Sequence, residues 1–468
     1  MRASVVAEKL GIPSVTDLCA PFVKQGQLIA EMEGVPGAPI AEYPSHIDTH
    51  SIEQRNRYIE EQVLPQIIKG LTEPPKEVRL AAIEEPGLRD IIFKGTFEEI
   101  NTFFYDKQWS DGLPIVPPTL EKVEEFLKYT GHYHDEVLGV LPPGNREATV
   151  WNVAVNGVMA GCRPEYMPIL IAMVEVMAEP RFRIQTAGAT PGWEAIVILN
   201  GPIVKQLDFN YKVGALRPGF LPNTSVGRFW RLYLRNVAQL LPGSTDKSTW
   251  GRNFHVVLAE NHEALEEIGW EPLSVQQGFT ADDNVVTIQS IRGRGYDVQV
   301  MGSTAEENLD MISYALLVFQ QNRLYQIRDE HSVLLGLTPL NAAVIARDGY
   351  LKKDVKQYLW EHTTLPAHVL EAVGHQGIPW KTRHGLGEDL CDAVKLGVLP
   401  KLYCESTDPN RMLPVWRSPD ELLIVVSGDP GRNRTMITGS SVVHGLPTSK
   451  KIELPANWAE LLTEARKK

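Results

Sequence analysis

The chain has 468 residues, of which 43% are hydrophobic and 22% are charged, so its length and composition suit two or three globular domains. Its formal net charge of −12 argues against nucleic acid or an anionic membrane as a partner, because either would need a basic face. No stretch reaches the roughly 18 to 20 apolar residues that span a bilayer, and the first residues lack the apolar core of a signal peptide. We therefore expect a cytoplasmic protein with no membrane partner.

The first 72 residues predict a small α/β unit. A helix up to Leu10, a strand at 14–18, a helix at 21–33, a strand at 38–43 and a helix at 51–71 follow one another along it. This alternation predicts a parallel α/β layer, although such a unit normally opens with a buried central strand and this one opens with a helix. We therefore expect that a piece of the unit is missing from this sequence.

A proline-containing linker at 73–95 separates this unit from a larger region at 96–468. That region begins with predicted helices at 97–105, 119–128, 148–160 and 164–178, a buried strand at 195–199, and a helix from Asn223 or Ser225 to about 241. Strands follow at 254–259, 285–291, 297–300, 333–337 and 422–427, with helices at 305–320, 340–347 and 353–361. We find no internal repeat in the sequence. The predicted fold class is α/β (mixed α+β), with the larger region forming one domain or two lobes.

Four cysteines are spread along the sequence, at Cys19, Cys162, Cys391 and Cys404. None of them has the Cys-x-x-Cys spacing that is typical of zinc, iron–sulfur or dithiol redox sites. Isolated thiols in a cytoplasmic protein are normally reduced, so we expect four free cysteines and no self-contained metal framework. The sequence identifies no cofactor.

The segment 109–119, Trp-Ser-Asp-Gly-Leu-Pro-Ile-Val-Pro-Pro-Thr, has a backbone path that three prolines and a glycine restrict. A rigid segment of this kind is suited to holding side chains at a site. Asp111 is either a turn residue beside Gly112 or a carboxylate held as an acid, a base or a substrate anchor. Trp109 would add an apolar wall to a substrate site.

Cys162 lies between Gly161 and Arg163, where one predicted helix ends and the next begins at Pro164. A thiol near a helix N-terminus and a cation has a lowered pKa and is partly thiolate, so we predict Cys162 as a catalytic residue. The alternative is a small buried residue in a turn. Glu165 is either a first-turn charge favoured by the helix dipole or a general base.

Arg228, Arg231 and Arg235 have helical spacing, so one face of a helix presents three guanidinium groups. With a cap at Asn223, Arg228 would lie in the first turn, where free backbone amides and the helix dipole attract an anion. We predict Arg228 and Arg231 as substrate-binding residues. The alternative is a solvated helix face paired with local acids.

Asn200, Asn223 and Ser225 are neutral hydrogen-bonding residues that complete the predicted substrate-binding set. Helix capping would explain Asn223 without any ligand.

The histidines His46, His50, His132 and His134 have suitable atoms for a metal but form no recognised ligand set, so no metal ligand is predicted.

His255 and His331 begin or flank predicted strands, where structural histidines with satisfied hydrogen bonds are typical. The glycine-containing segment 428–434 lacks the Lys-Ser/Thr ending of a P-loop and the spacing of a dinucleotide fingerprint. A tight turn is the favoured interpretation of that segment.

Two stretches of the N-terminal unit resemble a known family. The segments 10–15, Leu-Gly-Ile-Pro-Ser-Val, and 35–40, Val-Pro-Gly-Ala-Pro-Ile, resemble the later part of the UGSC-type domain, which is named for a selenocysteine-or-cysteine, Gly, Ser, Cys signature on its first strand. The larger region resembles long proteins found beside that family, at 111–119, 158–166, 200–203, 223–228, 270–272 and 347–359. The signature strand is absent from this sequence. The resemblance therefore implies that a second subunit or an upstream segment supplies it, and it suggests thiol or redox chemistry.

The leading hypothesis from the sequence is an enzyme that acts on a small anionic or polar organic molecule, with thiol-dependent oxidoreductase or lyase-type chemistry. Asp111, Cys162 and Glu165 would be catalytic, and Arg228 would bind the negative group of the substrate. One alternative is a non-catalytic binding or scaffold subunit that completes a partner carrying the UGSC signature. Another is a metal-dependent hydrolase or hydratase. We also expect an oligomer.

Overall fold

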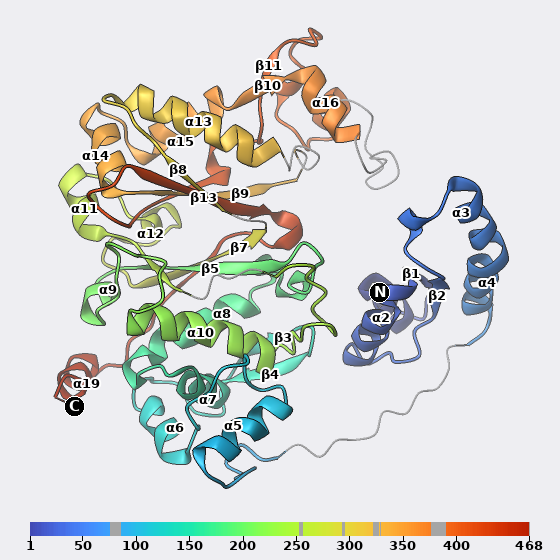
Figure 1. Ribbon diagram of the computed structural model, residues 1–468, viewed down its shortest axis with the longest axis horizontal. Helices are drawn as coiled ribbons and strands as arrows, with labels where there is room; N and C mark the ends of the chain where they lie inside the picture. The colour runs from blue at the N-terminus through green and yellow to red at the C-terminus, as the bar shows by residue number, and fades with distance from the viewer. Residues whose placement is uncertain are drawn as a thin grey trace.

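The computed structural model describes residues 1–74, 86–251, 256–292, 295–321, 327, 329–375 and 390–467. Figure 1 shows a small N-terminal unit, drawn in blue, and a larger body in which two β-sheets lie face to face between layers of helices. The predicted mixed α/β fold class is confirmed.

The N-terminal unit is the parallel α/β layer that the sequence predicts. Strand β1 (Thr16–Cys19) pairs in parallel with β2 (Ile40–Tyr43), so that Cys19 lies opposite Tyr43. The helices of the unit are α1 (Arg2–Lys9), α2 (Ala20–Met32), η1 (Ile47–Thr49), α3 (Ile52–Tyr58), the π-helical η2 (Ile59–Val63) and α4 (Leu64–Thr72). Hydrogen bonds between described residues join the unit to the body, from Gln25 Nε2 to the Thr245 carbonyl at 3.0 Å and from Asn145 Nδ2 to the Met32 carbonyl at 2.9 Å.

The first lobe of the body is built on a four-stranded sheet in the order β14-β7-β5-β6. Helices α7, α8 and α10 cover its outer face (Figure 1). In chain order, the elements from α5 to β7 are α5 (Phe97–Asp106), α6 (Leu120–Leu127), β3 (Val137–Leu141), β4 (Arg146–Thr149), α7 (Val150–Ala160), η3 (Pro164–Tyr166), α8 (Met167–Ala178), η4 (Pro180–Phe182), η5 (Ile184–Thr186), β5 (Trp193–Asn200), α9 (Ile203–Gln206), α10 (Leu221–Asn236), β6 (Leu258–Ala259), α11 (His262–Ile268), α12 (Leu273–Gln276) and β7 (Val285–Arg292). Of these, α11 packs in the core of the second lobe.

Two helix starts in this lobe differ from the prediction. The helix expected from residue 148 begins at Val150, because Arg146–Thr149 pairs as β4 and the Thr149 side chain caps the helix instead. Helix α10 begins at Leu221 after Phe220, so neither Asn223 nor Ser225 is its cap, and that prediction is wrong.

The second lobe is built on a four-stranded sheet in the order β12-β9-β13-β8. Helices α13, α14 and α15 cover its outer face (Figure 1). The remaining elements are β8 (Tyr296–Gln299), α13 (Ala305–Gln321), β9 (His331–Leu337), α14 (Pro339–Arg347), α15 (Lys352–His362), β10 (Thr364–Pro366), α16 (Ala367–His375), α18 (Leu390–Lys395), η7 (Lys401–Cys404), β11 (Met412–Pro414), η8 (Pro419–Glu421), β12 (Leu422–Val426), β13 (Arg434–Ser441), η9 (Val442–His444), β14 (Thr448–Lys451) and α19 (Trp458–Ala465).

The two sheets repeat one topology. In each, a central strand (β5 or β9) pairs in parallel with one neighbour (β6 or β12) and antiparallel with the other (β7 or β13). The fourth strand is exchanged, because β8 follows β7 in the chain but pairs with β13, and β14 follows β13 but pairs with β7. Each lobe therefore completes the sheet of the other.

The registers of the two sheets also match. In the first sheet, Val286 of β7 pairs with Leu199 of β5 on one side and with Lys450 of β14 on the other. In the second sheet, Thr435 of β13 pairs in the same way with Leu337 of β9 and with Val298 of β8. Leu199 and Leu337 therefore occupy equivalent positions. A short sequence echo becomes visible with this alignment, in Arg-Pro-Gly-Phe-Leu at 217–221 before α10 and Arg-Asp-Gly-Tyr-Leu at 347–351 before α15. Both glycines have positive φ, of +133° and +95°. The prediction of no internal repeat is wrong.

A buried ion pair joins the two lobes beneath an apolar seam. The carboxylate of Glu260 accepts from Lys352 Nζ at 2.9 Å, from the Val426 amide at 3.1 Å and from Asn200 Nδ2 at 2.6 Å. Burial lowers the pKa of Lys352, and the charge of Glu260 opposes that shift. The seam itself contains Ile196, Ile198, Leu258, Leu334, Leu423 and Val425.

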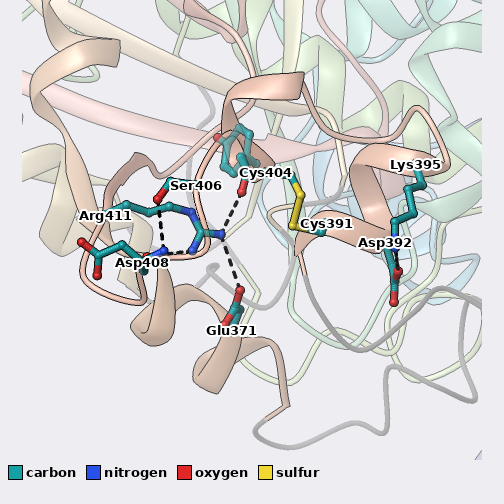
Figure 2. The surroundings of a disulfide bond; sticks show 9 residues. Glu371, Cys391, Asp392, Lys395, Cys404, Ser406, Asp408 and Arg411 are labelled. Atoms are coloured by element: carbon teal, nitrogen blue, oxygen red, sulfur yellow. Dashed lines mark hydrogen bonds and ion pairs between the residues drawn. A yellow bond between two sulfur atoms is a disulfide. The ribbon is translucent and has the colours of Figure 1, made fainter.

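Cys391 and Cys404 form a disulfide that ties α18 to η7 (Figure 2). Arg411 lies beside it, donating to the Tyr403 carbonyl at 2.9 Å and lying 3.8 Å from Glu371. The prediction of four reduced cysteines is wrong, because the chain turns back between these two positions and only Cys19 and Cys162 are free. Sequence spacing does not show that turn.

Candidate functional site

Asp111 and Arg228, two of the predicted site residues, form a bidentate ion pair. Arg228 Nε donates to Asp111 Oδ2 at 2.9 Å and Nη2 donates to Oδ1 at 2.8 Å. Nη2 also donates to the Pro114 carbonyl at 2.9 Å. Burial alone would raise the pKa of Asp111, but the hydrogen bonds and charge of Arg228 outweigh it and lower that pKa. The pair fixes the proline segment against α10.

Arg228 lies beyond the first turn of α10, so the prediction of an anion site at that helix N-terminus is wrong. Trp109 packs against Phe103 and Phe104, on the side of the proline segment that faces α5.

Cys162 is buried close to Ser225 and Arg228. Burial raises the pKa of its thiol to about 12, although a hydrogen bond with Ser225 and the charge of Arg228 act in the opposite direction. The prediction of a lowered pKa is wrong. The physical reason is burial, which outweighs the opposing contributions at this position just after the C-terminus of α7.

Glu165 is buried in η3, with its carboxylate 3.9 Å from Arg163. The structure thus gathers Asp111, Cys162, Ser225 and Arg228 in one region, where charges and hydrogen bonds are already satisfied within the protein.

The other predicted residues lie in separate networks. Asn223 is buried inside α10, donates to the Val257 carbonyl at 2.8 Å and accepts from the Asn210 amide at 2.8 Å. Arg231 lies 3.1 Å from Asp246 and 3.7 Å from Glu194. Asn200 ends β5 and belongs to the Glu260 network, where its Oδ1 is buried without a hydrogen-bond partner in the described part of the chain.

Three of the four histidines considered for a metal pair with local polar groups, and the fourth, His134, packs its ring against Trp151. His46 lies 3.5 Å from Asp48, and His50 Nδ1 lies 2.8 Å from the Tyr43 hydroxyl. His132 lies 2.9 Å from Glu136. Among the described residues, no group of three His, Cys, Asp or Glu side chains is placed to hold a metal ion.

Two further sequence interpretations concern His255 and the segment 428–434. His255 lies outside the described residues. At 428–434 the chain makes a tight turn, in which Gly428 has φ +93° and the Gly431 amide donates to Asp429 at 2.8 Å.

A cavity of about 240 Å³ lies between the lobes, at the amino ends of β9 and β12. We call it the interlobe cavity. The first lobe contributes Arg181 and Gln277, and the segment between β13 and β14 contributes Leu446 and Pro447. The second lobe contributes Glu330, His331, Ser332, Arg417, Ser418, Asp420, Glu421 and Leu423.

His331 is the most unusual residue of this cavity. It is buried, yet neither ring nitrogen has a hydrogen-bond partner within the described residues. The same holds for Ser332 Oγ and for Glu421 Oε2, which lies 3.7 Å from His331 Nδ1. Buried polar groups are normally paired, so these atoms need an explanation.

Sequence reasoning missed this site and treated His331 as a satisfied structural histidine. His331 and Glu421 are far apart in the sequence, and only the parallel pairing of β9 with β12 brings them together. The sequence feature that could have pointed to this site was a histidine at the start of a predicted buried strand.

The charged groups of the interlobe cavity divide into a paired set and two unpaired side chains. Arg417 Nε donates to Glu421 Oε1 at 2.9 Å, and its Nη2 lies 3.7 Å from Glu330. Arg181 and Asp420 are both exposed, and neither forms an ion pair among the described residues. Burial lowers the pKa of the nearby Lys356, and the negative charge of Asp420 opposes that shift.

Residues 1–73 match the UGSC family, which confirms the resemblance of the N-terminal unit. Both lobes of the body lie outside that match. No curated protein and no solved structure matches the chain. No helix within the described residues is both long enough and apolar enough to cross a bilayer.

Proposed function

We propose that the protein is an enzyme acting on a small anionic or polar organic molecule, and that the reaction takes place in the interlobe cavity. The observation that supports this proposal is a buried His331 whose ring nitrogens lack partners where it lines a hollow. Leaving such groups unpaired costs about 1–3 kcal/mol each, a cost that a ligand or catalytic role would explain.

Proton transfer is the chemistry that these side chains favour. Glu421 Oε2 lies 3.7 Å from His331 Nδ1, which is beyond hydrogen-bond distance, and Arg417 holds Oε1 of the same carboxylate. With the Nδ1 proton directed at Glu421, Nε2 is the atom that would take or give a proton. A base oriented by a third group is a recurrent catalytic arrangement.

Thiol chemistry at Cys162 receives less support than proton transfer at His331. A thiol whose pKa is about 12 is almost entirely neutral near pH 7, and the thiolate is the nucleophilic form. Arg228, which the sequence predicted to bind the anionic group of the substrate, already donates two hydrogen bonds to Asp111.

The test begins with a ligand screen on the full chain. Small polar and anionic metabolites are added to the wild type, to His331→Gln and to a control variant, His368→Gln, whose exposed side chain hydrogen-bonds with the Pro409 carbonyl. We expect ligands that raise the melting temperature of the wild type and the control but not of His331→Gln. A ligand that is turned over should lose about 10²–10⁴-fold in kcat in His331→Gln. Equal turnover by both proteins would refute the proposal.

A second candidate function is a binding or scaffold subunit. It is favoured by the β1–β2 sheet, which has two strands within the described residues and so offers open edges for a further parallel strand. An isolated two-stranded sheet is marginally stable, which gives such an addition a physical benefit. A peptide bearing the Cys-Gly-Ser-Cys signature should bind the full chain stoichiometrically in calorimetry. Its failure to bind, with binding to a UGSC-type control domain intact, would count against this role.

A further inference from the structure

We propose that the interlobe cavity recognises a zwitterion, a small molecule carrying one ammonium group and one carboxylate, such as an amino acid with a polar side chain. This inference rests on the proposed function and names the class of ligand for the same site.

The first step concerns the charged side chains of the cavity that form no ion pair within the described residues. Arg417 is occupied by Glu421 and Glu330, so it is not available to grip a ligand. Arg181 and Asp420 remain, one of each sign, and neither has an ion-pair partner in the described ranges of the chain. A carboxylate would pair with the fork of Arg181, and an ammonium group would pair with Asp420.

The second step concerns the charge of the whole lining. Two arginines, Arg181 and Arg417, face three carboxylates, those of Glu330, Asp420 and Glu421. Lys356 adds a third positive charge near Asp420, so the charges of the region nearly balance. A simple anion would leave Asp420 unpaired, and a simple cation would leave Arg181 unpaired. A molecule with both charges and no net charge satisfies both exposed groups.

The third step is the buried end of the cavity. His331 and Ser332 supply polar atoms without partners, while Leu423, Leu446 and Pro447 form an apolar wall. A ligand that ends in a hydroxyl or amide on a short carbon chain matches this lining. The volume of about 240 Å³ lies below the roughly 300–1,000 Å³ of drug-sized sites, which suits a small metabolite.

Calorimetry on the full chain tests the inference with matched probes. Threonine, asparagine and glutamine are each compared with the hydroxy acid that lacks the amino group and with the amine that lacks the carboxylate. At least one zwitterion should bind ten or more times tighter than both of its analogues. Arg181→Gln should weaken that zwitterion at least tenfold while leaving the amine analogue unchanged. Asp420→Asn should show the reverse pattern with the hydroxy acid. Both side chains are exposed, so the variants should retain the wild-type melting temperature.

The outcomes separate this inference from the proposed function. If no zwitterion binds, or if an analogue with a single charge binds equally well, the inference is wrong. It is also wrong if both variants keep the wild-type Kd within twofold. Should a singly charged ligand bind and lose affinity in His331→Gln, the proposed function stands and only the zwitterion is excluded. If a ligand binds His331→Gln as tightly as it binds the wild type, both the zwitterion inference and the proposed function are wrong.

Discussion

The two lobes share a strand topology and register but fill equivalent positions differently. Trp193 and His331 are each the first residue of the central strand. In the first lobe Trp193 packs against Phe182 and Trp230, and its indole donates to the His444 carbonyl at 3.2 Å. In the second lobe His331 lines the interlobe cavity, and its ring nitrogens have no hydrogen-bond partner among the described residues. The same topology thus holds a closed aromatic core at one strand start and a cavity-lining histidine at the other.

Side chains near the start of α10 and of α15 donate to equivalent carbonyls of the two sheets. Asn223 Nδ2 donates to the Val257 carbonyl at 2.8 Å, and Lys352 Nζ donates to the Ile424 carbonyl at 3.1 Å. These two carbonyls are equivalent in register, since each lies two residues before the end of the strand that pairs in parallel with the central one. The Asn223 amide thus bonds within the first lobe, whereas the Lys352 ammonium group also donates to Glu260 of the other lobe.

The largest predicted effect comes from breaking this interlobe pair. Lys352→Met leaves the carboxylate of Glu260 buried without its cation, so the free energy of unfolding should fall by about 3–5 kcal/mol. Urea denaturation followed by circular dichroism measures the change.

The double variant Lys352→Met with Glu260→Gln is the matched control. It removes both charges and should recover more than half of the loss, because no unpaired charge remains buried. A single variant as stable as the wild type would mean that the Glu260–Lys352 pair does not hold the lobes together.

Leucine at each of the two equivalent strand starts tests the central comparison directly. Trp193→Leu opens a void in a filled core and should lower the free energy of unfolding by about 3 kcal/mol. His331→Leu removes buried unpaired nitrogens and should raise it by about 1 kcal/mol while abolishing ligand binding. Thermal and urea unfolding of both variants measure whether the free energy of unfolding falls for Trp193→Leu and rises for His331→Leu. A loss in both would show that His331 is an ordinary core residue.

Local patterns in the sequence predicted much of the fold but little of the site. Buried strands such as 195–199, and caps such as Thr119, follow from periodicity and side-chain type alone. The register that unites His331 with Glu421, and the strand exchange between lobes, depend on contacts between distant segments that no local pattern records.

Cys162 illustrates the same limit in electrostatic terms. Its neighbour Arg163 favoured a lowered pKa, but burial dominates and raises it. Burial is a property of the whole fold.

The disulfide belongs to the second lobe and offers an intermediate effect. Cys391 and Cys404 are 13 residues apart, so Cys404→Ser should cost about 2–3 kcal/mol through the freedom regained by the unfolded chain. Dithiothreitol should lower the melting temperature of the wild type and leave that of Cys391→Ser/Cys404→Ser unchanged. An equal response of both proteins would assign the effect to something other than this bond.

The smallest predicted effect contrasts a paired side chain of α10 with an exposed side chain of α15. Arg228 holds Asp111, whereas Gln357 hydrogen-bonds with Glu361 alone among the described residues. Asp111→Asn should lower the free energy of unfolding by about 1–2 kcal/mol at pH 7, and Gln357→Ala by less than about 0.5 kcal/mol.

The contribution of Asp111 should depend on pH. Because the pKa of Asp111 is lowered in the folded protein, the Asp111–Arg228 pair stabilises the folded state at pH values above the usual pKa of 3.8. That contribution is lost as pH falls through the lower, folded value, so urea unfolding of Asp111→Asn and the wild type should converge in this acid range. A difference that persists there would mean that Asp111 acts through packing, and that charge does not distinguish the two helices.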